Sequence, residues 1–250
     1  MKKIIFFFVA GIMLQGNIKA QQFIDKASIE FEVKTNLQKT MGGNMWEDMM
    51  KENMPTFKTA YYQYTFADNK SFYKLDHFDE KGKLPDWLKK DDEECEWYAD
   101  YKTGILKMKK TVVGSDFFIN DSLTKIEWKL SNESRVIAGF NCRKATGKIF
   151  DSVYVFVFYT DEITISGGPC SIGGLPGMIL GMTIPRLFTS WIATKVNVTS
   201  VNESIIKPAT AKKIYPKKEY ISLLTERTKD WGQYYEDKSS LNRFLWGALL

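Results

Sequence analysis

ASIEFEVK, at residues 27–34, alternates apolar and polar residues, and this pattern decides the fold prediction. Successive side chains of an extended strand point to opposite sides of a sheet, so Ile29, Phe31 and Val33 would share one face. The polar residues between them would share the other face. The segment is therefore predicted to be a half-buried β-strand with one face on the hydrophobic core.

The same alternation with period two recurs along most of the chain. Further strands are predicted at residues 59–66, 71–75, 95–101, 105–112, 116–120, 124–130, 135–150 (with a break near Gly139), 152–160, 178–184 and 188–198. Short strands with close turn signals favour antiparallel meanders over βαβ crossovers, which would need helices between the strands. We therefore predict a mainly β (α+β) fold, with a large curved antiparallel sheet or an incomplete barrel.

Two segments show helical features. Residues 44–53 lie between a glycine pair and Pro55, which is typical of a short helix or of a loop with one turn. Residues 217–238 carry apolar side chains at helical spacing and predict a C-terminal helix packed on the sheet. The apolar tail at residues 241–250 is expected to dock on the body of the protein.

The first twenty residues have the composition of an export signal. A basic start at residues 1–3 precedes an almost wholly apolar run at residues 4–14, and Ala20 offers a small residue for cleavage. This run is too short to span a bilayer and is typical of a secretory signal peptide. We therefore expect a signal peptide at residues 1–20 and a single mature domain at residues 21–250.

The charge of the mature chain excludes one class of partner. Removal of Lys2, Lys3 and Lys19 lowers the net charge from +5 to +2. Nucleic-acid binding is therefore not expected, because phosphate contacts need a basic excess. The mature sequence contains no apolar run long enough for a transmembrane segment, and Gln21 stands where a lipoprotein would have its acylated cysteine. We expect a periplasmic protein that is not a lipoprotein.

Cysteine and histidine are too few for a recognisable metal or cofactor site. Cys95, Cys142 and Cys170 allow at most one internal disulfide, and two readings stay open: buried reduced thiols or one disulfide. A single histidine, His77, and the lack of a C-x-x-C pair argue against zinc. Methionines at 41, 45 and 49 could bind Cu(I), but packing or an adaptable apolar lid is preferred. No metal or cofactor is predicted.

Catalytic motifs are also missing from the sequence. The segment Gly168-Pro169-Cys170-Ser171 does not match a nucleophile elbow, and His77 is the only candidate imidazole base. Chemistry that uses carboxylates alone stays open, because paired Asp and Glu side chains cannot be recognised without geometry. The run at residues 89–94, KKDDEE, is interpreted as a charged turn between two elements. The sequence leaves an enzymatic activity open and favours a non-enzymatic protein.

The most distinctive segment is rich in glycine and proline, at residues 166–181. Glycine is used where φ is positive or where the backbone must approach another group closely, and Pro-Gly is typical of a type II turn. The loop is either architectural or forms a cup for a ligand. The candidate partner- or ligand-binding residues are Gly168, Pro169, Gly174, Leu175, Pro176, Gly177, Met178 and Ile179.

The heptapeptide at residues 174–180, GLPGMIL, resembles the signature of the GLPGLI (Porph_ging) family of exported Bacteroidetes proteins. Residues 128–130 and 136–145 resemble the second block of that family, and residues 159–163 resemble the stretch that leads to the signature. The resemblance covers about residues 118–190. It implies a cell-envelope protein encoded near TonB-dependent outer-membrane receptors.

The resemblance yields a functional expectation. It implies a periplasmic, non-enzymatic accessory protein of an outer-membrane transport complex, with an outer-membrane transporter or another envelope protein as partner. The alternatives are a periplasmic carrier of a small hydrophobic ligand or lipid, which would bind on the concave side of the sheet, and an envelope hydrolase.

Overall fold

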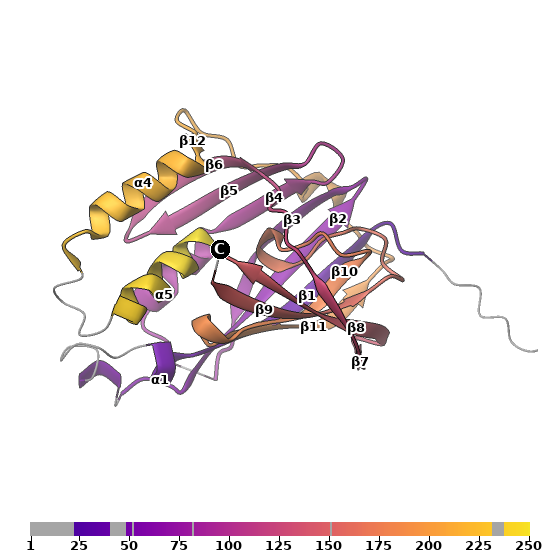
Figure 1. Cartoon of the computed structure of the whole chain (residues 1–250), viewed down its shortest axis with the longest axis horizontal. Coiled ribbons are helices and arrows are strands. Elements are labelled where there is room, and N and C mark those ends of the chain that lie inside the picture. Colours follow the sequence, from indigo (N-terminus) through magenta and orange to yellow (C-terminus); the bar gives the residue numbers. More distant parts are fainter. Residues whose placement is uncertain (1–22, 41–48, 52, 82, 151, 232–237) are drawn as a thin grey trace, which may run out of the picture.

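The computed structural model describes residues 23–40, 49–51, 53–81, 83–150, 152–231 and 238–250. Its main feature is one open sheet, which contains twelve strands within these residues (Figure 1). The strands are β1 Ala27–Asn36, β2 Phe57–Ala67, β3 Lys70–Phe78, β4 Glu96–Asp100, β5 Ile105–Val112, β6 Ser115–Ser122, β7 Lys129–Ile137, β8 Phe140–Ile149, β9 Val153–Thr160, β10 Met178–Ile184, β11 Thr189–Asn197 and β12 Tyr215–Pro216.

The sheet consists of two meanders joined along one seam. The strand order is β12-β6-β5-β4-β3-β2-β1-β11-β10-β9-β8-β7. Strands β1 to β6 form one meander and β7 to β11 form the other, because within each group every strand pairs with its neighbour in the sequence. The seam is the antiparallel pairing of β1 with β11, in which Phe31 lies opposite Ala193. Only the short β12 runs parallel to its neighbour β6. The predicted mainly β fold with an open, curved sheet is confirmed.

The alternation in the sequence corresponds to the two faces of the sheet. Ile29 and Phe31 on β1, and Tyr64 and Phe66 on β2, have exposed fractions of 0–1%. Phe31 packs edge-on against Tyr64, with ring centroids 6.4 Å apart. Burial of aromatic rings on this face supplies most of the apolar area that stabilises the sheet.

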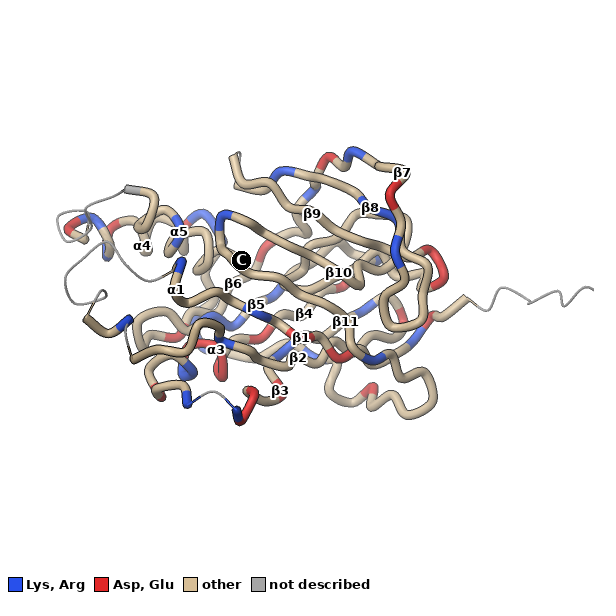
Figure 2. The backbone as a smooth tube through the Cα atoms, turned by 90° about the horizontal axis from the view of Figure 1, so that it is seen from below, with Lys and Arg blue, Asp and Glu red and all other residues tan. Residues whose placement is uncertain are grey.

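Helices cover the concave side of the sheet and its edge. The helices are α1 Leu37–Thr40, α3 Lys90–Glu93, α4 Lys217–Thr228 and α5 Lys238–Leu249, and the 3-10 turns are η2 Asp86–Leu88, η3 Pro169–Ser171, η4 Pro185–Leu187 and η5 Glu203–Ile205. Figure 1 shows the sheet bending around α5. Figure 2 shows basic and acidic residues interspersed along the backbone.

The C-terminal region differs from its prediction. The helix expected at 217–238 ends at Thr228, and the apolar tail forms a second helix, α5. The reason is spacing: Leu241, Phe244, Leu245 and Ala248 recur on one face of a helix, a pattern hidden by the uniformly apolar character of the tail. The two helices are joined where the hydroxyl of Tyr220 donates to the carbonyl of Ala248 at 2.9 Å.

One predicted strand is wrong, and two expected segments are not described. Residues 123–128 form no strand, because Ile126 and Trp128 pack over Gly147 on the face of the sheet. The signal peptide at 1–20 lies outside the described residues, as does most of the segment 44–53. None of the described helices has the length and apolar character needed to cross a membrane.

Candidate functional site

A cavity of about 490 Å³ lies on the concave side of the sheet, beneath α5. Its walls come from segments far apart in the sequence: β1 to β5, η2, α3, η3, η4, β11 and α5. This volume lies within the range of pockets that bind small molecules, which occur where curved elements leave a concavity. The curvature of the sheet and the position of α5 together create the cavity.

One side of the cavity is aromatic. Tyr62 and Tyr73 stack with ring centroids 5.0 Å apart, and Tyr73 lies 5.3 Å from the ring of Trp97. Trp87, on η2, also lines the cavity and keeps 53% of its surface exposed. Three rings therefore form a buried wall, and Trp87 offers a free aromatic face to a ligand.

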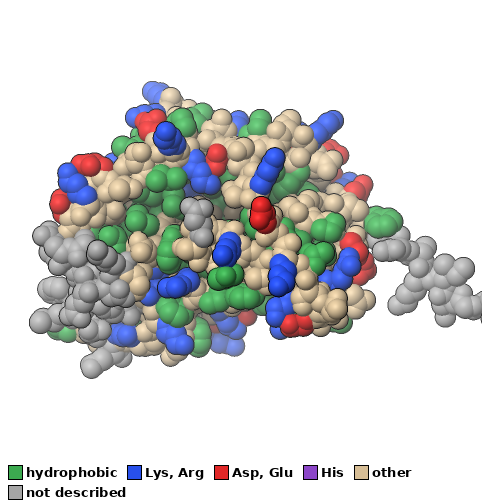
Figure 3. Space-filling view, in the orientation of Figure 1, with side chains coloured by type: hydrophobic (Ala, Val, Ile, Leu, Met, Phe, Trp, Pro, Cys, Tyr) green, Lys and Arg blue, Asp and Glu red, His purple; other side chains and the backbone are tan. Residues whose placement is uncertain are grey.

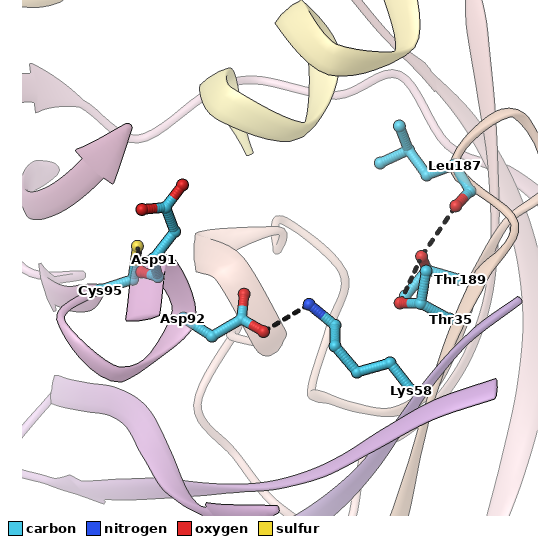
Figure 4. A network of polar contacts seen from close by, with 7 residues as sticks. All are labelled: Thr35, Lys58, Asp91, Asp92, Cys95, Leu187 and Thr189. Carbon is cyan, nitrogen blue, oxygen red and sulfur yellow. Dashed lines mark hydrogen bonds and ion pairs between the residues drawn. The ribbon is translucent and has the colours of Figure 1, made fainter. Parts of the chain in front are cut away.

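Two adjacent carboxyl groups enter the cavity from the short helix α3. Lys58 of β2 donates to the Oδ2 of Asp92 at 2.5 Å, and both side chains are largely covered. Asp91 precedes Asp92, and its backbone carbonyl accepts a hydrogen bond from the Cys95 thiol at 2.9 Å. Figure 4 shows both carboxyl groups directed from α3 toward the space beneath α5. The thiol hydrogen bond and the ion pair fix the orientation of this turn.

The two carboxyl groups have different surroundings. Burial raises the pKa of the Asp91 carboxyl above its usual value, and the backbone N–H groups of Val113 and Gly114 act in the opposite direction. Asp92 has the ammonium of Lys58 as a direct partner, 2.5 Å away. Adjacent carboxyl groups in unlike environments can play different chemical roles at the same pH.

Two more cations line the cavity. The ammonium of the buried Lys110 lies 4.5 Å from the centroid of the Trp97 ring, a cation–π contact. Arg243 of α5 reaches the cavity from the opposite side, and its Nη1 donates to the carbonyl of Thr40 at 3.2 Å. With Lys58, the lining holds three basic side chains and the two carboxyl groups. The cavity can therefore donate and accept charge-assisted hydrogen bonds.

Tyr73, which lines the cavity, has an unsatisfied hydroxyl. This hydroxyl is buried and has no hydrogen-bond partner among the described residues. Burial raises its pKa well above the usual value; the indole of Trp191 acts in the opposite direction, although its geometry falls short of a hydrogen bond. A buried polar group without a partner costs about 1–3 kcal/mol. The hydroxyl lies behind the lining, out of reach of a molecule the size of water, so it would pair with a ligand only after the wall moves.

The cysteines divide between the cavity and the core. All three are free thiols, and Cys95 and Cys170 line the cavity. Burial raises the pKa of the Cys170 thiol to about 12, although the charge of Lys110 opposes this shift. Burial likewise raises the pKa of Cys142 to about 12. Cys142 and Cys170 are therefore protonated at neutral pH and are weak nucleophiles.

The glycine- and proline-rich loop reaches the cavity only through Cys170. Its candidate residues, Gly168, Pro169, Gly174, Leu175, Pro176, Gly177, Met178 and Ile179, line neither this cavity nor the other cavities found among the described residues. All except Gly174 and Pro176 are buried or closely packed. Gly177 has φ +135°, and a Cβ there would lie 2.0 Å from the carbonyl oxygen of Thr160. The binding role assigned to this loop stays a prediction.

The other singled-out residues also lie apart from the cavity. His77 stacks on Tyr61 at 4.6 Å and contacts Asp76 at 2.8 Å, on an exposed part of β3. Met41 and Met45 lie outside the described residues, and Met49 is 63% exposed. In the described part of the chain, no three His, Cys, Asp or Glu side chains form a group that could hold a metal ion.

Sequence reasoning missed the residues that line the cavity. The run at 89–94, which the sequence predicts to be a charged turn between two elements, carries Asp91 and Asp92 into the cavity lining. One signal could have drawn attention to it: tryptophans at positions 87 and 97 flank the acidic run. Aromatic and acidic residues close together in a sequence are typical of polar ligand sites.

Comparison with known structures places the fold. A solved structure described as PNGF-II in the P21 space group matches with a TM-score of 0.53 and 14% identity, over 80% of this chain and 33% of that chain. The same protein in the C2 space group matches with a TM-score of 0.46 and 16% identity, over 89% of this chain and 33% of that chain. This chain thus spans about a third of the length of PNGF-II, and at this identity the likeness shows the fold alone. No curated protein matches the chain.

The comparisons correct the assignment made from the sequence. The matching family model is the N-terminal domain of PNGase F-II, described as "N-glycanase peptide, N-terminal domain", so the GLPGLI assignment is wrong. The predicted function rested on that assignment. An accessory role in TonB-dependent outer-membrane transport, with a carrier as the alternative, is overturned by the same findings, which point to an N-glycanase fold.

The family match covers only part of the cavity lining: it includes Trp97, Lys110 and Cys170, whereas Lys58, Tyr73, Trp87, Asp91, Asp92 and Arg243 lie outside it. It extends over residues 93–227, more than half of the chain, from the end of α3 through α4. The resemblance to the GLPGLI signature, at residues 174–180, lies inside this range and reflects a loop that the sheet requires. The chain belongs to the family of PNGase F-II N-terminal domains.

Proposed function

We propose that this chain is a glycan-recognising domain that serves an N-glycanase type of activity and binds N-glycosylated peptides in the cavity beneath α5. One observation carries the proposal: the exposed Trp87 lines a cavity that also presents carboxyl groups, ammonium groups and a wall of aromatic rings. The family name supplies the substrate class, because it describes an N-glycanase.

The chemistry of a sugar matches this lining. A pyranose ring has an apolar face of C–H groups that packs on an aromatic side chain, and a rim of hydroxyl groups that both donate and accept hydrogen bonds. Trp87 supports the first contact; Asp92, with its neighbour Lys58, supports the second. Tyr73 adds its ring to the aromatic wall on which the apolar face of a sugar would pack.

The test compares one peptide with and without its N-linked glycan, by isothermal titration calorimetry. The glycosylated peptide is expected to bind, and the bare peptide is expected to bind at least about tenfold more weakly, since an aromatic and hydrogen-bonded contact contributes about 1.4 kcal/mol or more. Trp87→Ala should remove most of this difference. Because Trp87 is half exposed, the variant should keep its fold.

A matched control uses another exposed aromatic residue. Phe57 is 49% exposed and lines none of the cavities found among the described residues, so Phe57→Ala should keep the preference for the glycosylated peptide. Equal binding of the two peptides to the unmodified protein would reject the proposed function. So would a preference that Trp87→Ala leaves intact.

A second function, removal of the glycan by this chain itself, is favoured by the surroundings of Asp91. Its raised pKa suits a group that donates a proton, while the neighbouring Asp92 is paired with Lys58. Mass spectrometry of the glycopeptide after incubation with the chain tests this function. Glycan release that Asp91→Asn abolishes would support it, and a fully intact glycopeptide would reject it while leaving the recognition proposal standing.

A further inference from the structure

A second cavity, of about 350 Å³, lies on the other side of Arg243. It is formed between β9, the turn η4 with the residue that follows it, and α5. Its aromatic walls are Tyr154, Phe156, Phe188 and Trp246, and its charged lining residues are Arg186 and Arg243. Arg243 lines both cavities, so the two are neighbours on either side of one guanidinium group.

Arg243 has hydrogen-bonding capacity that the described residues leave unused. Its Nη1 donates to the carbonyl of Thr40, but its Nε is buried without a hydrogen-bond partner. The guanidinium group lies 5.0 Å from the centroid of the Phe188 ring, which fixes its plane. The Nε is sealed from a molecule the size of water, so a ligand in the cavity would meet the guanidinium group through its Nη atoms.

Other cations surround the same cavity. Arg186 is exposed on η4 and has no ion pair with any described carboxylate. The ammonium of Lys148 lies 5.0 Å from the ring of Tyr154, and that of Lys39 lies 5.8 Å from the ring of Phe188. No acidic side chain is among the described lining residues. Figure 3 shows basic and hydrophobic side chains together on the face that carries α5 and β9.

The two arginines and the aromatic walls of this cavity suit a ligand in which an anionic group is attached to a ring. A planar guanidinium group matches the geometry of a carboxylate, and the charge-assisted hydrogen bonds formed are about twice as strong as neutral ones. The aromatic walls would pack on the ring that carries the carboxylate. A simple inorganic anion would leave these walls without a partner.

We propose that this second cavity, the arginine site, binds a carboxylate-bearing sugar residue of the glycan whose neutral part occupies the first cavity. The proposal rests on the proposed function, because it extends the same ligand past Arg243. The first cavity then recognises the neutral glycan and its peptide, and the arginine site adds a preference for acidic glycans.

The test titrates two forms of one glycopeptide, with the glycan ending in N-acetylneuraminic acid or with that acidic sugar removed. The acidic form is expected to bind about tenfold more tightly at low salt, and the ratio should fall as salt is raised. Arg186→Gln should bring the ratio of the two affinities toward one. Arg135→Gln is the matched control, because Arg135 also stacks on an aromatic ring, Phe158 at 4.3 Å, but does not line the cavity.

The outcomes separate this inference from the proposed function. Equal affinities for the two forms, unaffected by Arg186→Gln, would overturn the arginine site and leave glycan recognition intact. If neither form binds, the proposed function fails, and free N-acetylneuraminic acid becomes the probe. Binding of the free sugar that Arg186→Gln weakens and Arg135→Gln does not would support the arginine site; no binding of the free sugar would overturn it.

Discussion

The glycine- and proline-rich loop and the charged run play different roles from those that their sequences suggest. The glycine- and proline-rich loop at 166–181 has the most distinctive composition in the chain, yet most of its residues are buried in the framework of the sheet. The charged run at 89–94 has an ordinary composition, yet it brings two carboxyl groups into the largest of the described cavities. The unusual composition of the loop at 166–181 therefore reflects constraints on its backbone. The charged run at 89–94 becomes a functional candidate because the fold brings other residues close to Asp91 and Asp92.

The largest expected effect tests the architectural role of the loop. Gly177→Ala should lower the free energy of unfolding by about 3 kcal/mol or more, because the new Cβ would collide with the carbonyl of Thr160 at a φ of +135°. Gly174→Ala should cost only about 1–2 kcal/mol, since φ is +90° but the nearest atom, Trp128 Nε1, lies 3.7 Å away. Urea unfolding followed by tryptophan fluorescence measures both.

The same pair of variants sharpens the comparison between the two regions. Folded Gly174→Ala should bind the glycopeptide as the unmodified protein does, because Gly174 does not line the cavity, to which the loop contributes only Cys170. If Gly177→Ala yields no soluble protein while Gly174→Ala does, the collision is supported directly. Equal stabilities of the two variants would refute the architectural reading of Gly177.

The next effect concerns the ion pair that orients the charged run. Lys58→Met should lower stability by about 1.5–3 kcal/mol, because it leaves the largely covered carboxylate of Asp92 without its partner. It should also weaken glycopeptide binding about tenfold, since Asp92 would lose its fixed orientation. A double-mutant cycle with Asp92→Asn gives the coupling energy, which we expect to be about 1–2 kcal/mol.

An exposed ion pair serves as the control for this cycle. Lys34 contacts Glu32 at 2.8 Å on the surface of β1, and about half of the Lys34 side chain is exposed. Lys34→Met should therefore cost about 0.5 kcal/mol or less and leave binding as it was. The coupling energy between Lys58 and Asp92 should exceed the loss of stability caused by Lys34→Met. A coupling energy no larger than that loss would contradict the proposed role of the ion pair.

The smallest effect is a pH dependence of stability at Asp91. Burial raises its folded-state pKa above the usual value of an aspartate, so its contribution to stability is fully present below that usual value and is lost as the pH rises through the folded-state pKa. Asp91→Asn should therefore be slightly more stable than the unmodified protein at pH 7, by less than about 1 kcal/mol because the group is partly exposed. The difference should vanish near pH 3.

Asp100 offers a control of opposite sign. Burial acts to raise the pKa of Asp100, but hydrogen bonds from Thr103 and Lys102 outweigh burial and lower it. Its contribution to stability is therefore present at neutral pH and lost as the pH falls through the lowered pKa. Asp100→Asn should destabilise the protein at pH 7. Urea midpoints at pH 3 and pH 7 measure both variants, and shifts of the same sign would contradict this account.

The sequence predicted the sheet because strand formation is largely local. Alternation located β5 and β10 to the residue, at 105–112 and 178–184. It failed at 124–128, where Ile126 and Trp128 pack over Gly147 and no strand forms. Periodicity reports that one face of a segment is buried, but not what covers it.

The cavity could not be predicted in the same way, because its residues come together only in three dimensions. Lys58, Asp92 and Arg243 belong to β2, α3 and α5, and the spacing between them in the sequence has no period. The family assignment failed for a related reason. A seven-residue loop at 174–180 is constrained by the backbone, so similar loops can arise wherever a sheet needs the same turn.

The seam between β1 and β11 has a consequence for how the chain reaches this structure. Glu32 of β1 lies opposite Ile192 of β11, which comes 160 residues later in the chain. During synthesis, β1 can therefore pair with β11 only after most of the chain has been made. Contacts of such separation slow folding, because the entropy of closing the loop must be lost before the pairing stabilises anything. Each meander can form from neighbouring strands, whereas the seam must form late. The concave side beneath α5 is therefore completed last, and an unfinished chain would expose the unpaired edges of β1 and β10.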